Sequence, residues 1–347
     1  MQTGGRTAGL ISVPQGGTLF FCENGGLPLI HLILYNQEGT EMSRKIIALL
    51  LVVLMAFGMT GAMAEDAAVT VTDMHDRVVT LSEPATRVVA LTPSDCEILC
   101  ALGCEDALVG RGQYCDYPES ILDVPVVQSG ADTNIEEILA LEPQVVLMSD
   151  MSQTDEQARL LEENGVKVVI SDANDIAGTY TAIRMIGTLM GKDAEAEALV
   201  SDMQATFDEI AAASVNTGKT VYFEVSPLQW GLWTAGSGTF MDELAAMCGL
   251  TNAFADVEGW AAISEEQVLE RNPDYIVTIT MYYGEGPTPV EEIMGREGWA
   301  ELKAVVAGDI LNADSNAVSR PGPRLKDAAI ELYNFINGAD TEEAPAA

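Results

Sequence analysis

Two stretches of the chain, 130 residues apart, decide its architecture: NIEEILALEPQVVL at 134–147 and SEEQVLERNPDYIV at 264–277. Each begins with a residue that can cap a helix, followed by acids in the first turn and a short helix. A proline and a run of β-forming residues come next. First-turn acids suit the positive end of a helix dipole, so the start of a helix already explains them. The repeat predicts a chain built from two similar α/β halves.

Strand-like and helix-like stretches alternate through both halves, which is typical of α/β layers. A helix is expected to begin at Pro93-Ser94-Asp95, with Ser94 as its cap. Between the halves, the stretch from Asp193 to Ala213 predicts a long helix capped by Asp193. Its length of roughly 30 Å suits a spine between two lobes. The apolar residues that recur along it at helical spacing are Leu199, Met203, Phe207 and Ile210. Strands are expected at 88–91, 144–148, 167–170, 220–225 and 275–279.

The segment 42–64, MSRKIIALLLVVLMAFGMTGAMA, has a basic start, an apolar run and a small-x-small end at Ala62-Met63-Ala64. These features indicate a secretory signal peptide cleaved near Ala64. A membrane anchor is the alternative, although the apolar run is short for a bilayer span. We interpret 1–41 as an upstream extension from a start codon assigned too early. Without a lipobox cysteine between 42 and 95, the expected product is soluble and periplasmic or otherwise extracytoplasmic.

The expected divisions of the remaining chain follow from these segments. The N-terminal lobe is expected at 65–192, the linking helix at 193–214 and the C-terminal lobe at 215–338. A disordered tail is expected at 339–347.

The charge balance excludes one class of partner. The chain has 53 acidic and 17 basic residues and a net charge of −36, whereas nucleic-acid binding needs a basic face. The same charge argues against docking on an anionic membrane. The first 64 residues contain three acids, three bases and one of the two histidines. The rest therefore keeps the full net charge and only His75, which excludes a multi-histidine metal site.

Five cysteines follow the signal segment, so an odd number leaves at least one thiol without an intrachain partner. Cys96, Cys100 and Cys104 are spaced by four and share one face of a helix. They fit either a metal or cluster site or, as we favour, small apolar residues of a core. Gly103 is expected to end the helix before Cys104. A Cys104–Cys115 disulfide is a further alternative.

Several motifs, in this order and spacing, resemble the cobalamin and iron-complex solute-binding proteins of ABC importers over residues 70–338. They are RVVALTPSDCEILCALG (87–103), VGRGQYCDYP (109–118), NIEEILALEP (134–143), GSGTFMDEL (236–244), ISEEQVLERNPD (263–274) and SRPGPRL (319–325). The resemblance implies an α/β fold of two pseudo-symmetric Rossmann-like lobes, the class III periplasmic-binding-protein architecture, with a ligand between the lobes. It also implies a monomer that undergoes modest closure and delivers its ligand to an ABC permease dimer with its ATPase.

The resemblance assigns Glu136 and Glu266, one on each lobe, to docking on the permease; the adjacent Glu137 and Glu265 rank lower. It also places Tyr114, Trp260 and Arg320 at the ligand cleft, while Arg324 braces the turn after Arg320. Further candidate ligand contacts follow strands at the cleft edge, although each aromatic could instead pack in a core: Trp230, Trp233, Tyr282 and Tyr283.

The ligand expected from the resemblance is a metal chelate, with no resident cofactor or metal. An anionic ferric siderophore or haem would use the charge of Arg320. A corrinoid would depend on aromatic area.

The chain departs from the cobalamin branch in two places. Residues 128–133, QSGADT, lack an expected aromatic residue, and the position expected to pair with Cys248 is Tyr333, so Cys248 is expected to be free.

The sequence leaves two alternatives to capture for import. The chain has no GxSxG, HExxH or GxxxxGK[ST] motif and no GxGxxG that opens a helix, and Glu224 is an acid without a visible partner. A Cys-ligated redox enzyme is therefore the one enzymatic alternative. A transporter-independent sensor on the same fold is the other. We favour a binding protein without catalytic activity.

Overall fold

The computed structural model describes residues 10–12, 18–20, 68–149 and 153–338 of the chain. The chain divides into two units, 1–65 and 66–347. In the first unit, β1 (Leu10–Ser12) pairs antiparallel with β2 (Thr18–Phe20). The proposed signal segment at 42–64, the tail at 339–347 and most of 1–41 lie outside the described residues. Among the described residues, no helix is both long and apolar enough to cross a bilayer.

The first lobe is a wholly parallel sheet in the order β7-β6-β5-β8-β9. Its central strands β5 and β8 are buried along their length, as expected for a parallel sheet covered on both faces. A hairpin of β3 (Val69–Thr72) and β4 (Val78–Leu81) precedes the sheet. The strands and helices are β5 (Val88–Ala90), α2 (Pro93–Ala101), η1 (Glu105–Ala107), β6 (Leu108–Gly112), η2 (Glu119–Ile121), β7 (Val126–Val127), α3 (Ile135–Ala140), β8 (Val145–Met148), α4 (Asp155–Glu163), β9 (Lys167–Ile170) and α5 (Ile176–Leu189).

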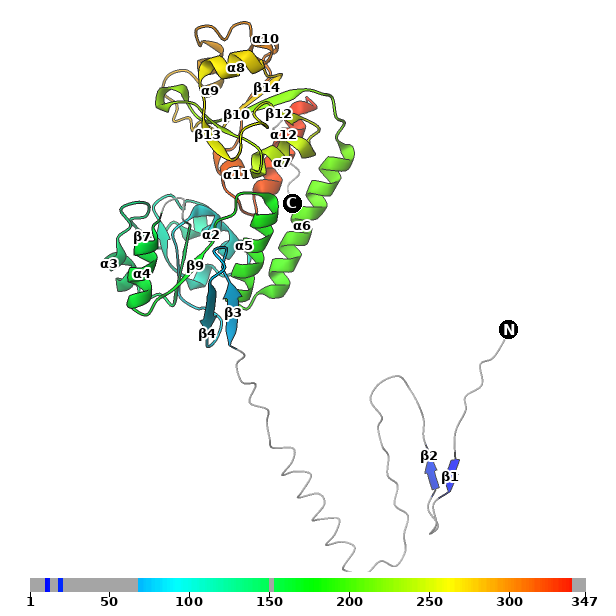
Figure 1. Ribbon diagram of the computed structural model, residues 1–347. Coiled ribbons are helices and arrows are strands. Elements are labelled where there is room, and N and C mark those ends of the chain that lie inside the picture. Colours follow the sequence, from blue (N-terminus) through cyan, green and yellow to red (C-terminus); the bar gives the residue numbers. More distant parts are fainter. Residues whose placement is uncertain (1–9, 13–17, 21–67, 150–152, 339–347) are drawn as a thin grey trace, which may run out of the picture. The chain divides into compact units, whose positions relative to one another are not determined.

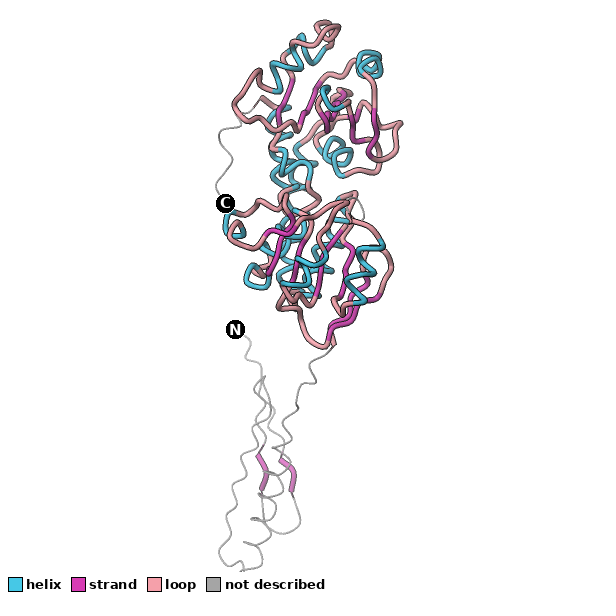
Figure 2. Tube along the Cα trace, turned by 90° about the vertical axis from the view of Figure 1, so that its left-hand side faces the viewer, coloured by secondary structure: helices cyan, strands magenta, loops and turns pink. Residues whose placement is uncertain are grey.

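The second lobe has a mixed sheet in the order β13-β11-β10-β14-β15, with β12 also pairing with β10. Strands β10, β14 and β15 are parallel, whereas β11 pairs antiparallel with both β10 and β13. The two lobes are therefore related but not identical (Figures 1 and 2). The elements are β10 (Thr220–Ser226), η3 (Leu228–Trp230), β11 (Trp233–Ala235), α7 (Phe240–Met247), β12 (Thr251–Asn252), β13 (Trp260–Ala262), α8 (Glu265–Arg271), β14 (Tyr275–Thr278), α9 (Pro289–Met294), α10 (Lys303–Ala307), β15 (Ile310–Asn312), α11 (Ser315–Ser319) and α12 (Leu325–Ile336).

Helix α6 (Asp193–Ala213) joins the two lobes, as the sequence predicts (Figure 1). It buries one stripe of side chains in a single apolar cluster that reaches from Val88 in the first sheet to Phe223 in the second. Full burial of a Val, Ile, Met or Phe side chain contributes about 1.5–3 kcal/mol. The helix is therefore part of both cores rather than a free linker. Its buried residues are Ala196, Val200, Met203, Phe207 and Ile210.

The capping predictions have mixed outcomes. The side chains of Asn134 and Ser264 accept hydrogen bonds from the third residue of α3 and α8, which confirms both caps and the repeat. The caps predicted at Ser94 and Asp193 are wrong. Thr92 precedes α2, and Pro93 is its first residue, where a fixed φ and a missing N–H cost least. Asp193 is the first residue of α6, and its carboxylate accepts from the hydroxyl of Thr188 instead.

The cysteines that follow the signal segment are free thiols. Cys96 and Cys115 each direct Sγ at the carbonyl oxygen of Ala90, at 3.8 Å, and Cys104 faces the carbonyl of Leu102. The alternative of a Cys104–Cys115 disulfide is therefore excluded, whereas the prediction that Cys248 is free is confirmed. Helix α2 ends at Ala101, before Gly103, as expected. Cys96 and Cys104 belong to the apolar core and Cys100 packs against it.

Candidate functional site

The second lobe has a cavity of about 680 Å³ at the edge where β10, β14 and β15 end. Ligands of open α/β sheets bind at the carboxyl ends of the strands. The volume lies within the 300–1,000 Å³ that is usual for small-molecule sites. The lining comes from the segments that follow these strands and from α9: Val225, Pro227, Leu228, Gln229, Trp230, Ile279, Thr280, Met281, Tyr282, Tyr283, Glu285, Pro287, Pro289, Glu292 and Ser315.

Aromatic and sulfur-containing side chains form much of this lining. Trp230 is 77% exposed, and Tyr282 and Tyr283 are also accessible. The hydroxyl of Tyr282 donates to the carbonyl oxygen of Gly286 at 3.3 Å, and that of Tyr283 donates to Sδ of Met281 at 3.2 Å. Such a surface offers a ligand a large apolar contact area with a few polar groups at its edge.

A buried ion pair anchors one wall of the cavity. Nη1 and Nη2 of Arg296 lie 2.6 Å and 2.9 Å from the two carboxylate oxygens of Glu224, and Nη2 is 2.6 Å from Glu292. Burial raises the pKa of the Glu224 carboxyl, and hydrogen bonds from Arg296 oppose that shift. The inference that Glu224 lacks a partner is therefore wrong, because its partner lies on the turn that follows α9. The ion pair ties this turn to β10.

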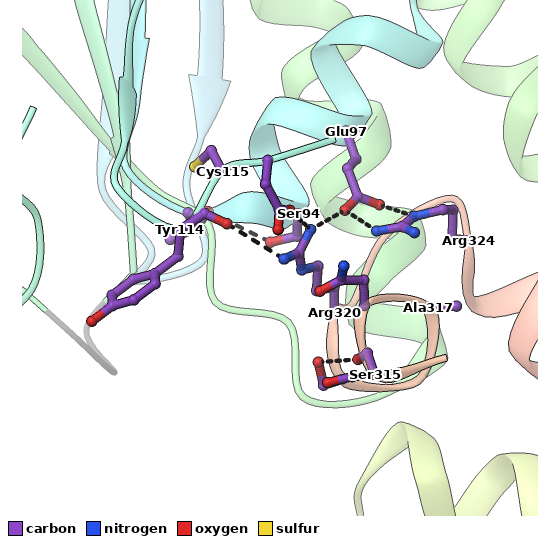
Figure 3. Close-up of polar contacts among 12 residues, drawn as sticks. Ser94, Glu97, Tyr114, Cys115, Ser315, Ala317, Arg320 and Arg324 are labelled. Carbon is purple, nitrogen blue, oxygen red and sulfur yellow. Dashed lines mark hydrogen bonds and ion pairs between the residues drawn. The ribbon is translucent and has the colours of Figure 1, made fainter. Parts of the chain in front are cut away.

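A second charged cluster joins the two lobes (Figure 3). Glu97 of α2 is 3% exposed and accepts hydrogen bonds from Arg320 at 3.0 Å and from Arg324 at 2.7 and 2.9 Å. Nη1 of Arg320 also lies 2.8 Å from Asp116, and Nη2 donates to the carbonyl oxygen of Tyr114 at 3.4 Å. Two cations thus share one buried carboxylate. Removing one partner of a buried pair typically costs about 3–5 kcal/mol, since the other charge loses its compensation.

The structure brings together some of the predicted ligand contacts and separates others. Trp230, Tyr282 and Tyr283 share the cavity of the second lobe. Tyr114 follows β6 in the first lobe, is 67% exposed, and directs its ring away from the Glu97 cluster (Figure 3). Trp233 lies on β11, outside the lining of this cavity.

Trp260 packs against the protein core, and the guanidinium group of Arg320 already pairs with Glu97 and Asp116. The ring centroid of Trp260 is 5.3 Å from that of Phe240, which is fully buried.

Sequence reasoning did not find Glu97, Met281 or Glu292. A carboxylate inside the apolar segment CEILC was the available signal for Glu97.

The two acids assigned to docking occupy equivalent places. Glu136 is the second residue of α3 and Glu266 the second residue of α8, and both are exposed. Their neighbours are engaged within the protein. Glu137 accepts from the backbone N–H of Gln128 at 3.2 Å, and Glu265 accepts from Nε1 of Trp299 at 2.9 Å. A hydrogen bond from Ser264 lowers the pKa of Glu266, so its carboxylate is ionised at neutral pH. In each pair, one acid accepts a hydrogen bond from outside its own helix, and the other is exposed at the second position of the helix.

Two α/β lobes on one connecting helix, with an aromatic cavity at a sheet edge, define the class of bilobal solute-binding proteins. The chain belongs to the periplasmic binding protein family, whose sequence model matches residues 88–317. This match confirms the predicted family and the predicted two-lobed α/β architecture.

Three similar proteins give the family assignment further detail. The chain is 33% identical to YvrC of Bacillus subtilis, an uncharacterized ABC transporter substrate-binding lipoprotein, over 77% of this chain and 85% of that protein. It is 27% identical to a cobalamin-binding protein of Halobacterium salinarum, over 78% and 74% of the two chains. The crystal structure of the periplasmic vitamin B12 binding protein of Vibrio cholerae matches with a TM-score of 0.62 and 25% identity, over 75% and 99% of the two chains.

Proposed function

We propose that this protein is the extracytoplasmic solute-binding component of an ABC importer and acts by binding rather than by catalysis. It captures a metal chelate at the cavity of the second lobe and delivers it to a permease dimer with its ATPase. The observation that carries the proposal is the aromatic cavity at the carboxyl ends of β10, β14 and β15. The names of the relatives support a transport role and include cobalamin among the family's ligands.

A corrinoid is the chelate class that this surface favours. Its broad, weakly charged faces need aromatic contact area, which Trp230, Tyr282 and Tyr283 supply. Tyr114 of the first lobe is an exposed aromatic and is proposed as a further contact. A ferric siderophore or haem is the alternative.

Titration of tryptophan fluorescence with cyanocobalamin tests ligand capture, with free tryptophan as the control for absorbance by the ligand. Trp299 is fully buried and supplies a background signal. Saturable quenching is expected, and Trp230→Phe should remove most of it. Trp233→Phe is the matched control, because Trp233 lies outside the cavity lining. A response that matches free tryptophan would exclude cyanocobalamin as the ligand.

Glu136 and Glu266 are proposed to set the register of the protein on a two-fold permease. A symmetric partner needs one contact on each lobe, and these acids are exposed at equivalent helix positions. Each exposed ion pair is worth only about 0–1 kcal/mol, so both are needed for orientation. The proposed docking surface is therefore a pair of separated carboxylates, not a continuous patch.

An uptake assay tests the docking role. The double variant Glu136→Gln, Glu266→Gln should lose uptake of the chelate in cells while the purified protein binds the chelate as before. Glu119→Gln with Glu301→Gln is the control, since these exposed acids lie one on each lobe and outside α3 and α8. Loss of ligand binding in the first variant would contradict the docking role.

Export by cleavage after Ala64 completes the proposal. The small-x-small sequence of Ala62-Met63-Ala64 is the supporting feature. N-terminal sequencing of the protein recovered outside the cytoplasmic membrane should begin at Glu65. A start at Met42 or earlier would contradict cleavage.

A further inference from the structure

We infer that the cavity selects metal chelates that carry no net negative charge, and that it discriminates against anionic ones. This inference rests on the proposed function and specifies its ligand class. It reverses the role that the sequence suggested for Arg320, which was to receive an anionic siderophore or a haem propionate.

The two arginines at the junction of the lobes are already neutralised. Arg320 contacts Glu97 and Asp116 through Nη1, and its Nη2 donates to the carbonyl oxygen of Tyr114. Arg324 donates two hydrogen bonds to Glu97, and its guanidinium lies 4.0 Å from the ring centroid of Tyr117. Both guanidinium groups therefore have carboxylate partners before any ligand arrives.

Releasing Arg320 toward an anionic ligand is unfavourable. Arg320 is 9% exposed and Glu97 is 3% exposed, so both charges are largely removed from water. Withdrawal of Arg320 would leave Glu97 with only Arg324 and would free Asp116 beside the anion. Glu97 is buried, so water does not replace the cation that it would lose, and the exchange is costly.

The cavity itself is acidic. Among the described residues, the charged side chains that line it are the carboxylates of Glu285 and Glu292. Arg296 compensates Glu292 in part but is shared with Glu224. Glu285 is exposed in the loop between β14 and α9, next to the aromatic side chains. An anion that approaches Trp230 and Tyr282 therefore meets like charge, whereas a cationic or neutral chelate does not.

The charge of the whole chain acts in the same direction at longer range. A net charge of −36 at neutral pH repels anions and attracts cations during encounter. This contribution is screened beyond about 10 Å at 0.1 M salt, whereas the carboxylates beside a bound ligand are screened less. Binding measured at low and high salt therefore distinguishes repulsion by the whole chain from repulsion by the carboxylates beside the ligand.

Two matched ligand series test the inference on the exported protein, with dissociation constants from tryptophan fluorescence at low and high salt. The first is ferrioxamine B, which is cationic, with its neutral N-acetyl and anionic N-succinyl derivatives. The second is cyanocobalamin with its monocarboxylate derivative. In whichever series binds, the anionic member should bind at least tenfold more weakly than the neutral member. The difference should shrink but persist at high salt.

A charge-reversed variant assigns the effect to the cavity. Glu285→Lys should lower the ratio of the dissociation constants of the anionic and neutral members at least threefold. Glu301→Lys is the matched control: it changes the net charge equally at an exposed acid outside the cavity, and the discrimination should stay unchanged. Thermal unfolding confirms that both variants are folded.

The outcomes separate this inference from the proposed function. Equal or tighter binding of the anionic members would overturn the charge selection and leave the proposed function intact. An identical effect of Glu285→Lys and Glu301→Lys would overturn the assignment to the cavity. Failure of every member of both series to bind would overturn the proposed function and this inference with it.

Discussion

Nη1 of Arg320 lies 3.0 Å from Oε1 of Glu97, so an arginine that follows the last strand of the second lobe pairs with the first helix of the first lobe. Arg324 approaches the same carboxylate. The contact joins the lobes at a place other than α6. Together, the helix and the ion cluster favour modest closure of the lobes over a wide hinge motion.

Replacement of Glu97 should strongly destabilise the protein. Glu97→Gln leaves two buried guanidinium groups beside a neutral amide, so the free energy of unfolding should fall by about 3–5 kcal/mol. Urea unfolding measures this change. Glu119→Gln, at an exposed acid of the same lobe, should change it by less than about 0.5 kcal/mol. A loss below about 1 kcal/mol for Glu97→Gln would show that the cluster contributes little.

The contribution of Asp95 to stability should rise as the pH is lowered from 7 toward 4. Burial raises the pKa of Asp95 from 3.8 to about 6 and Asp172 adds to the rise, while hydrogen bonds from Thr92 and Ser171 oppose it. The folded state therefore holds this proton more tightly than the unfolded chain does. The contribution is complete below about pH 4 and is lost as the pH rises through 6. Burial also raises the pKa values of Glu224, Glu243 and Glu331, which act in the same direction.

Asp95→Asn isolates this contribution. The amide needs no deprotonation, so the variant should be more stable than the wild type at pH 7 by about 1–3 kcal/mol and nearly equal at pH 4. Thermal unfolding across this pH range provides the measurement. An unchanged pH slope in the variant would contradict the role of Asp95.

Trp230 and Trp260 should have opposite phenotypes. Trp230 is 77% exposed at the cavity, so Trp230→Ala should weaken chelate binding and change stability by less than about 0.5 kcal/mol. Trp260 packs on Phe240, so Trp260→Ala should lower stability by about 2–4 kcal/mol through the lost packing. Binding and unfolding measured on both variants check the distinction. A stable Trp260→Ala variant that fails to bind would instead make Trp260 a ligand contact.

The thiols should be inert in the folded protein. Burial raises the pKa values of Cys100 and Cys248 to about 12, so little thiolate exists at neutral pH. Cys96, Cys104 and Cys115 are buried. A thiol reagent should react within hours in buffer and within minutes in denaturant, where the five thiols after Ala64 become accessible. Rapid reaction in buffer would indicate an opened first lobe.

The sequence by itself determined the local elements and the family. The caps at Asn134 and Ser264 and the helix from Asp193 to Ala213 were predictable, because capping and helical periodicity depend on residues within a few positions of one another. The repeat at 134–147 and 264–277 also predicted the two-lobed fold. The positions of Glu136 and Glu266 followed from the same repeat.

Only the tertiary structure decided which charges and rings meet. Arg320 and Glu97 are separated by 223 positions in the chain, and Arg296 and Glu224 by 72. No local pattern links such residues. The docking of the two lobes brings Arg320 to Glu97, and packing within the second lobe brings Arg296 to Glu224. Packing likewise sets Trp260 against Phe240 at the margin of the core and leaves Trp230 at the cavity. A side chain's partners depend on the neighbours that packing supplies, and for these residues they come from distant parts of the chain.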